Sequence, residues 1–593
     1  MNDRRATLII RGQKMGVWKK LSELKMPFND AVNYTSKVDK DFFNKLFLRT
    51  AEVQNLIQPN IYYLVGEKGS GKTAYAVWVQ NNTPRRVDAG IDVKSKVVTM
   101  TETQYKRFIQ LKDSGRLTFS DYANIWRPML CSVAAQVIVE KSKNFFHKFL
   151  SGKFNNIEAE LNEFHKGAMN PEIESAFEHV TGLSAGLKVG NEKVASGHLE
   201  GSVNHTESGA TIRHHLLEKE RGLKSALSEL RLSDDHIVFI DAIDFKPDSI
   251  AYGEYVECVK GLAEASWQLN TEFFNGIKDS NGRIKIVLLL RPDIMSLLSI
   301  YNSNSRIQDN TVLLDWSTTE KEYKSSPLYE LSGRYFASQQ HKKDVPADLA
   351  WRQYIEPDAS DDPQFRELLK LTFQKPRDIL TFVRLALTHQ SKNGHGEAER
   401  INADVLTSTA LRRDFTEYLL GEVRNYSAFY MPSSDFNSYI KFFQYLNGSS
   451  KFRRADCDAA FGHFIAWAAG EPITNRDFLR DVEALLQFFY DVNVIGYSEQ
   501  AVEGKGTFYH WAYRERTLNN ISPKVKTEGV MMLNPGIAKS LDIGVAMRTR
   551  VNSVPAKVRV APSGRGEQPA RGESQGRRRG RRGGKSKPKP PRG

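Results

Sequence analysis

Residues 60–73 read NIYYLVGEKGSGKT, a short β-rich run that ends at a glycine and continues as a glycine-rich loop. The loop matches the pattern G-x-x-x-x-G-K-[ST] in full. Its residues are Gly66, Glu67, Lys68, Gly69, Ser70, Gly71, Lys72 and Thr73. A helical pattern follows in residues 74–79, so strand, loop and helix stand in the order that a phosphate-binding loop requires.

This loop predicts a site for ATP with Mg²⁺. Its glycines let the backbone wrap closely around phosphate oxygens, so that amide N–H groups point at them. Lys72 is expected to reach the β- and γ-phosphates, and the Thr73 hydroxyl to bind Mg²⁺. The alternative is a glycine-rich turn that matches by accident, and the flanking strand and helix argue against it.

A carboxylate at the end of a second apolar run completes the prediction. Residues 237–244 read IVFIDAID, in which Asp241 is the expected Mg²⁺ partner. Asp244, three residues on, is expected to orient or deprotonate the attacking water, although either acid could instead cap the next element. No Glu follows Asp241 directly, where many P-loop ATPases keep their catalytic acid, and this departure favours slow hydrolysis or a switch.

Two arginines are candidates for sensing the terminal phosphate. Arg291 ends the apolar run 284–290, and Arg377 lies in the helical segment that begins KPRD. A guanidinium at either place would respond to the charge of the phosphate. The alternatives are a surface arginine before a proline at 291 and a lid arginine without ligand contact at 377.

Alternating strands and helices predict a doubly wound α/β P-loop NTPase core with a parallel sheet. Its strands are expected at 60–65, 237–240, 284–290 and 312–314. We place a helical lead-in at 1–55, the ATPase domain at 56–395 with an insertion at about 150–215, and a helical and winged-helix-like domain at 396–545. A helical lid is expected from about 320 to 420, and the strands of a hairpin at 494–497 and 508–513.

The composition indicates a protein of the cytoplasm. No apolar stretch approaches the ~18–20 residues of a membrane span, and we expect no membrane contact. The cysteines, Cys131, Cys258 and Cys457, are far apart and show no metal-ligand spacing, as in a reducing compartment.

Positive charge is concentrated at the end of the chain. The net charge is +14, and residues 561–593 hold eleven Lys/Arg against two Glu, a net +9 that leaves +5 for the rest. Residues 546–593 are rich in Arg, Gly and Pro and predict a disordered basic tail. Such a tail binds nucleic-acid phosphates by counterion release, or it only aids solubility. Cations in the hairpin region are mixed with acids, and that region either contacts DNA or packs on the core.

Five stretches, in this order, resemble bacterial P-loop ATPases related to the STAND, KAP and ORC-like AAA+ lineages. They are GEKGSGKTAYAVW, IVFIDAID, KIVLLLRPDI, QKPRDILTF, and FYHWAYRER with the later LNPGI. The resemblance covers residues 20–545. It implies an ATPase core, a helical lid, a winged-helix-like module and an ATP-controlled switch in mobile-element biology or antiviral defence. By position, Arg291 resembles the sensor and Arg377 the lid arginine.

Three functions remain open on the sequence. One is an ATP-hydrolysing switch that engages nucleic acid and forms homo-oligomers or recruits an effector protein. Another is a non-enzymatic, ATP-regulated nucleic-acid scaffold, and the third is a signalling NTPase that recognises a protein. A GTPase is disfavoured because SKVD, at 36–39, the only stretch like a guanine-reading motif, precedes the loop.

Overall fold

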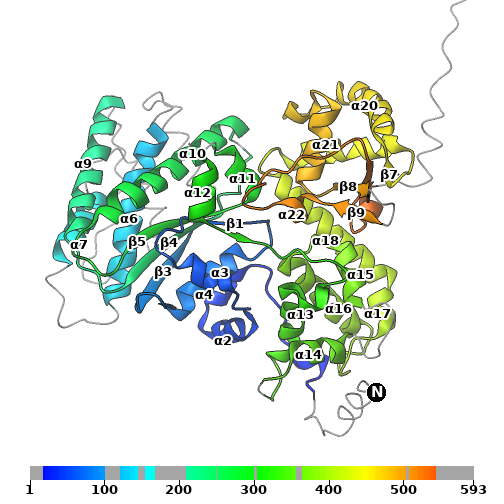
Figure 1. Ribbon diagram of the computed structural model, residues 1–593, viewed down its shortest axis with the longest axis horizontal. Coiled ribbons are helices and arrows are strands. Elements are labelled where there is room, and N and C mark those ends of the chain that lie inside the picture. Colours follow the sequence, from blue (N-terminus) through cyan, green and yellow to red (C-terminus); the bar gives the residue numbers. More distant parts are fainter. Residues whose placement is uncertain are drawn as a thin grey trace, which may run out of the picture. The chain divides into compact units, whose positions relative to one another are not determined.

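The computed structural model describes residues 18–100, 121–143, 154–166, 209–248, 250–298, 303–342, 344–355, 364–501 and 506–541. Most of the insertion expected at about 150–215 and the predicted tail from 546 lie outside these residues. The described part is a mixed α/β structure, as predicted, with a mostly parallel sheet and many helices (Figure 1). None of the described helices is long and apolar enough to cross a membrane.

The central sheet has six strands in the order β2-β3-β4-β5-β1-β6. The strands are β1 (Tyr63–Gly66), β2 (Arg85–Arg86), β3 (Ile91–Thr99), β4 (Asp235–Asp241), β5 (Ile284–Leu290) and β6 (Thr311–Leu314). Only β2 runs antiparallel to its neighbour, β3. The four strands expected from apolar runs are confirmed, and β5 is buried at every position. That burial fits a parallel sheet covered on both faces.

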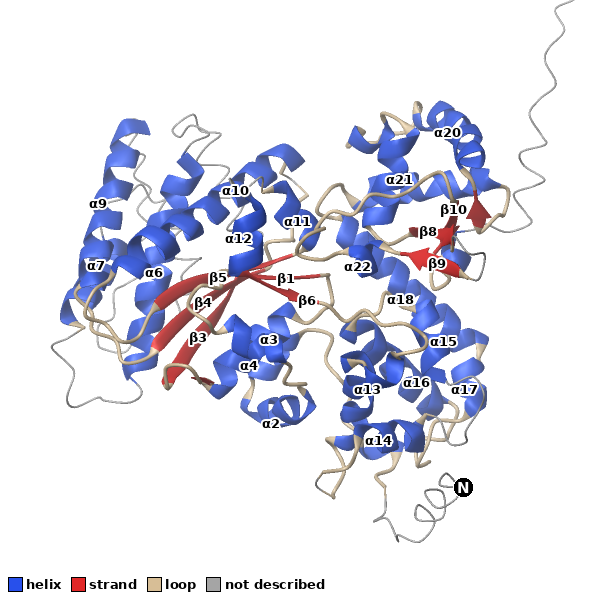
Figure 2. Ribbon diagram, viewed as in Figure 1, coloured by secondary structure: helices blue, strands red, loops and turns tan. Residues whose placement is uncertain are grey.

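Helices lie on both faces of this sheet, with α3 and α4 on one and α10 and α12 on the other (Figure 2). The helices and short turns of this region are α2 (Lys37–Leu46), α3 (Ala51–Leu56), α4 (Lys72–Asn82), α6 (Asp121–Lys143), α7 (Asn155–Lys166), α9 (Gly209–Ser228), α10 (Tyr252–Gln268), η5 (Leu269–Phe273), η6 (Phe274–Gly276), α11 (Pro292–Leu297) and α12 (Ser303–Asn310). These helices cover the sheet of the predicted ATPase domain.

The N-terminal lead-in joins the sheet region to the lid helices. It contains η1 (Leu21–Glu23) and η2 (Ala31–Thr35) before α2. Phe47 stacks on Trp78 of α4, with ring centroids 5.4 Å apart. On the other side, the Leu21 amide donates to the Ala398 carbonyl at 2.9 Å. The lead-in therefore contacts both walls of the space between sheet and lid.

The predicted helical lid is present as one cluster of helices (Figure 1). It comprises η7 (Tyr323–Ser325), α13 (Pro327–Ala337), α14 (Ala347–Tyr354), α15 (Gln364–Leu371), α16 (Pro376–Lys392), α17 (Ala403–Thr407) and α18 (Thr409–Ser427). Pro376 stands at the first position of α16, where its fixed φ suits a helix start and no N–H is needed. This proline places Arg377 in the first turn of α16.

The C-terminal part holds a four-stranded sheet in the order β7-β10-β8-β9. Its elements are α19 (Ser433–Tyr439), η8 (Ile440–Leu446), β7 (Lys451–Phe452), α20 (Arg454–Ala468), η9 (Asp477–Leu479), α21 (Val482–Asp491), β8 (Ile495–Gln500), β9 (Thr507–His510), α22 (Ala512–Glu515), β10 (Val530–Leu533) and η10 (Ala538–Leu541). We call residues 433–541 the C-terminal module. The expected hairpin is confirmed as β8 and β9, which pair antiparallel. The winged-helix assignment and the domain boundaries stay predictions.

Candidate functional site

The glycine-rich loop joins β1 to α4, which begins at Lys72. Gly69 and Gly71 have φ of +86° and +96°, in the left-handed region that glycine adopts without strain. A Cβ on Gly66 would lie 2.5 Å from Ser70 Oγ, so the turn needs glycine there as well. The first N–H groups of α4 have no acceptor within the helix and lie at the positive end of its dipole. The loop therefore presents donors suited to a phosphate group.

The Lys72 side chain folds back into the loop. Its Nζ donates to the carbonyl of Gly66 at 2.8 Å and to that of Glu67 at 3.2 Å. Burial lowers the pKa of Lys72 to about 8, although the nearby carboxylates of Asp244 and Asp241 act to raise it. Phosphate oxygens form stronger, charge-assisted bonds with an ammonium than carbonyls do. The side chain is thus placed to exchange these carbonyls for an anionic ligand.

Thr73 and Asp241 come together from α4 and β4. Thr73 Oγ1 donates to Asp241 Oδ2 at 2.6 Å, and the Ala242 amide donates to Asp241 Oδ1 at 2.8 Å. Burial raises the pKa of Asp241. A hydroxyl beside a carboxylate is an oxygen donor set that fits Mg²⁺. The described residues contain no group of three or more His, Cys, Asp or Glu that could hold a metal ion. Phosphate oxygens and water would therefore have to supply its other ligands.

Asp244 follows the tight turn at Ala242, whose φ of +62° is rare for a residue with a Cβ. Its Oδ2 lies 4.0 Å from Lys68 Nζ and 3.9 Å from the Arg291 guanidinium. Burial acts to raise the pKa of Asp244, but the positive charges of Lys68, Arg291 and Lys72 outweigh it and hold the pKa below the ordinary value. Asp244 is therefore a carboxylate at neutral pH and a weak base, better suited to orienting a water molecule than to taking its proton.

Arg291 is fully buried and bound by protein groups. Its guanidinium pairs with Asp293, donates to the Tyr426 carbonyl at 3.0 Å and lies 3.7 Å from the centre of the Tyr426 ring. Arg291 does not line the cavity described below, whereas Asp244 does. Arg291 is linked to the cavity lining through Asp244, which it approaches to 3.9 Å. A direct contact of Arg291 with the γ-phosphate stays a prediction.

Arg377 brings the lid to the loop. Its backbone N–H donates to the Gly69 carbonyl at 3.4 Å, and its guanidinium donates to Glu422 of α18 at 3.2 Å. A Cβ on Gly69 would lie 3.3 Å from Arg377 Cβ, so the close approach depends on glycine. Arg377 lines the cavity, within reach of a ligand placed on the loop.

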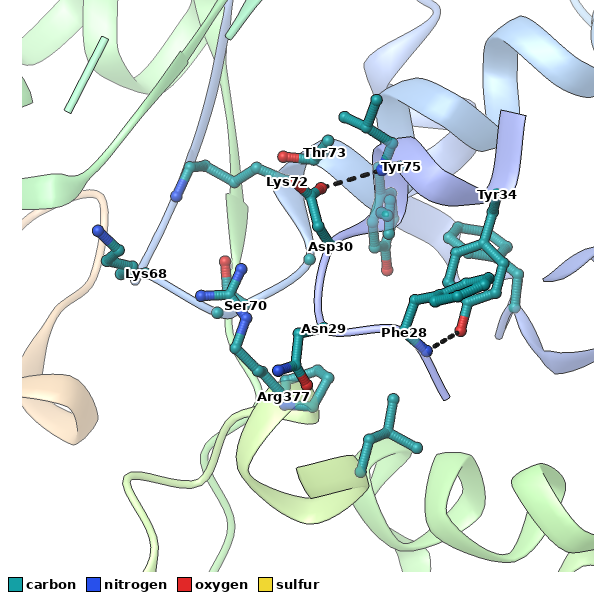
Figure 3. Close-up of a pocket in the computed structure, with 18 of the residues that line it drawn as sticks. Phe28, Asn29, Asp30, Tyr34, Lys68, Ser70, Lys72, Thr73, Tyr75 and Arg377 are labelled. Atoms are coloured by element: carbon teal, nitrogen blue, oxygen red, sulfur yellow. Dashed lines mark hydrogen bonds between the residues drawn. The ribbon is translucent and has the colours of Figure 1, made fainter. Parts of the chain in front are cut away.

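A cavity of about 450 Å³ joins the loop, the lid and the N-terminal lead-in. Lys68, Ser70, Lys72 and Thr73 stand on one side of it, and Phe28, Tyr34 and Tyr75 on the other (Figure 3). The apolar lining includes Phe28, Val32, Tyr34, Phe43, Leu46, Phe47, Leu48, Tyr75, Leu331 and Leu380. One part of the cavity is therefore charged and the other mostly apolar, although Asn29 and Asp30 also line it.

Sequence reasoning missed several residues of this site. The wall at 28–34 comes from a 3-10 turn before α2, a segment too short for hydrophobic periodicity. The indole N–H of Trp316, just after β6, donates to the Ser70 carbonyl at 2.8 Å. No local pattern in the sequence links Trp316 to the loop.

The cations considered for DNA contact in the C-terminal module differ in exposure: Arg516 is buried, Arg514 is partly buried and Arg476 is exposed. Arg516 is 4% exposed and pairs with Glu67 of the loop, and Arg476 donates to the carbonyls of Ala468 and Glu471. Arg480 is exposed, while Lys505 lies outside the described residues. Helix α21, directly before the hairpin, exposes only Glu483. Arg516 thus joins the module to the loop, and α21 offers no basic face to a groove of DNA. Contact of the module with DNA stays a prediction.

Comparisons with known proteins return only distant structural likenesses. No protein-family model and no curated protein matches the chain. Among solved structures, the ORC2 protein of Aeropyrum pernix in ADPNP and ADP complexes is similar at 10% identity and a TM-score of 0.28, over 85% of this chain and 95% of that one. At such values the likeness assigns neither an activity nor a partner to this chain.

Proposed function

We propose that this chain binds ATP with Mg²⁺ and hydrolyses it slowly, as a molecular switch. The observation that carries the proposal is the hydrogen bond between Thr73 and Asp241, which joins the glycine-rich loop to the acidic strand in the wall of the cavity. If the glycine-rich turn matched the motif only by accident, a hydrogen bond to a buried carboxylate from another strand would not be expected.

The charged part of the cavity suits a triphosphate. The loop amides and Lys72 would hold the phosphates, and Thr73 and Asp241 would hold the Mg²⁺. When bound, the ion would neutralise charge on the phosphates and polarise the terminal one. Arg377 would turn from Glu422 toward the added negative charge, because a phosphate competes well with a carboxylate for a guanidinium.

The apolar part of the cavity suits the base of a nucleotide. Phe28 is 41% and Val32 38% exposed, so both present apolar surface that a flat ring can cover. A volume of about 450 Å³ lies within the usual range for small-molecule sites. The SKVD stretch serves another purpose, because the Ser36 hydroxyl caps α2 by accepting from the Asp39 amide, and neither residue lines the cavity. This arrangement supports ATP over GTP.

The hydrolytic step rests on Asp244. As a carboxylate in the cavity wall, it would orient a water molecule toward the terminal phosphate. Its weak basicity and its neighbours Lys68 and Arg291 limit proton transfer, which supports a low turnover. Arg291 would keep the carboxylate in place.

The proposal is tested by steady-state ATP hydrolysis of the intact protein, beside Asp244→Ala. We expect slow turnover that falls at least tenfold in the variant, while ATP affinity changes little. Asp279→Ala, which removes an 81% exposed carboxylate, is the matched control and should keep full turnover. Tight ATP binding with no turnover above background would refute the enzymatic proposal and leave the ATP-regulated scaffold.

A second candidate, nucleic-acid engagement, rests on the basic tail sequence. We propose that residues 561–593 bind nucleic-acid phosphates without sequence preference and with steep salt dependence. Binding to double- and single-stranded DNA should be lost when these residues are removed and should weaken as salt rises. Retained, salt-insensitive binding would contradict it. A homo-oligomer, an effector protein and a role in mobile-element biology or defence stay predictions.

A further inference from the structure

Glu67, the second residue of the loop, is held by the C-terminal module. It is 8% exposed, and its Oε1 accepts from the guanidinium of Arg516, 449 residues away in the sequence. Lys375, from the turn before α16, places its Nζ 3.9 Å from Glu67 Oε2. A loop that needs only to bind phosphate does not require a buried carboxylate with partners from two other regions.

Arg516 is fixed from its own side as well. It follows α22 directly, and its guanidinium donates to the Asp491 carbonyl at 3.1 Å, at the end of α21. The Tyr426 hydroxyl lies 3.3 Å from the same guanidinium. The position of Arg516 therefore depends on the positions of α21 and α22.

A buried network continues from Arg516 to the reacting end of the cavity. The Tyr426 hydroxyl donates to Asp293 Oδ1 at 3.0 Å, Asp293 pairs with Arg291, and Arg291 lies 3.9 Å from Asp244. Charged hydrogen bonds in a buried setting reinforce one another. The network thus connects one edge of the loop to the candidate catalytic acid through a residue of the C-terminal module.

The backbone of Glu67 also takes part in the site. Its carbonyl is one of the two acceptors that hold Lys72, which ATP would draw away. The adjacent Lys68 donates to the Asn425 carbonyl at 3.2 Å. A shift of Glu67 would therefore move the resting place of Lys72 and the amides that receive phosphate.

We propose that Arg516 is a positioning residue of the nucleotide site, which holds the loop in its phosphate-binding form through Glu67 and couples the loop to the C-terminal module. The inference rests on the proposed ATP binding. Coupling is reciprocal, so ATP on the loop restrains the module, and the module in its packed position raises the affinity for ATP.

The experiment measures ATP affinity by calorimetry in Arg516→Met, Arg516→Lys, Glu67→Gln and the double variant Glu67→Gln/Arg516→Met. We expect each Met or Gln variant to bind ATP about tenfold more weakly, and the double variant to bind no more weakly than the weaker single one. Arg516→Lys should recover part of the affinity, because it keeps the positive charge. Arg476→Met, an arginine of the same module with no loop contact, is the matched control and should bind as the intact chain does.

A second readout separates coupling from mere stability. ATP should slow amide hydrogen exchange in β8, β9 and α22 of the intact chain, and this effect should be lost in Arg516→Met. Affinities within twofold of the intact chain in Arg516→Met and Glu67→Gln, with only a lower unfolding midpoint, would overturn the inference. Single effects that add in the double variant would also overturn it. Failure of the intact chain to bind ATP would refute the proposed function itself, and the inference with it.

Discussion

Asp293 is the shared acceptor of a buried cluster between the sheet and α18, and its removal tests the packing of the site. It is 6% exposed and accepts from Arg291 Nε at 3.0 Å and from the Tyr426 hydroxyl at 3.0 Å, and it also accepts from Tyr430. Asp293→Asn keeps the volume and removes the charge. Arg291, with no exposed surface, would then keep the Tyr426 carbonyl as a neutral acceptor, and its remaining carboxylate partner among the described residues would be Asp244 at 3.9 Å.

The expected cost follows from the burial of the pair. Removing one partner of a buried ion pair costs about 3–5 kcal/mol, because the other charge is left in a medium that cannot solvate it. Asp244 compensates in part, so we expect a loss at the low end, about 3 kcal/mol. Asp458→Asn removes one of the two carboxylate partners of Arg454 at the surface and should cost about 0.5 kcal/mol or less.

The dependence on pH adds a second constraint. Burial acts to raise the pKa of Asp293, but Arg291 outweighs it and holds that pKa well below the ordinary value. A depressed pKa contributes stability above the pKa of the unfolded chain, about 3.9, and this contribution is lost as pH falls through the folded value. The difference between intact chain and variant should therefore stay constant from pH 5 to 8 and shrink below about pH 4.

Urea unfolding followed by tryptophan fluorescence measures both effects. A loss below about 1 kcal/mol at pH 7, equal to that of the exposed pair, would refute the reasoning, since Arg291 would then have another way to be solvated. A difference that grows as pH falls from 5 to 3 would contradict the sign of the pKa shift.

Two further predictions concern the loop support and the lid. Trp316→Phe removes the N–H that Ser70 accepts and should weaken ATP binding about three- to tenfold, because a net hydrogen bond is worth about 1 kcal/mol. Trp78→Phe, whose buried indole N–H has no acceptor among the described residues, should leave the calorimetric affinity unchanged. Burial raises the pKa of Asp378 to about 6. The protonated acid therefore contributes up to about 3 kcal/mol to the free energy of unfolding below pH 4, and this contribution is lost as pH rises through 6. When the pH is raised from 4.5 to 7, the free energy of unfolding should fall less in Asp378→Asn than in the intact chain. An equal fall in both proteins, measured by urea unfolding, would contradict the raised pKa of Asp378.

The strands that hold the site could be predicted because they are buried on both faces. Ile237, Ile240 and every residue of β5 except the buried Lys285 are apolar, and the glycine spacing of the loop follows from its φ angles. Strand β3 was missed because its sequence, IDVKSKVVT, places Lys94 and Lys96 toward partners at its surface. Such alternation is weak evidence for a strand in a parallel sheet.

Contacts between distant segments could not be predicted. Glu67 and Arg516 are each ordinary residues in the sequence, and nothing local indicates that they form a buried pair. The wall at Phe28 depends on where the lead-in lies between sheet and lid. Arg291 follows a strand as a sensor would, yet Asp293, only two residues later, binds its guanidinium.

Calorimetric titration of ATP with Mg²⁺ into the intact chain and into Lys72→Ala tests the proposed site most directly. We expect one site per chain in the intact protein and an affinity at least tenfold lower in the variant, because Lys72 supplies a charged bond worth about 1.5–3 kcal/mol. Circular dichroism should show that the variant is folded. Equal affinities in two folded proteins would contradict nucleotide binding on this loop.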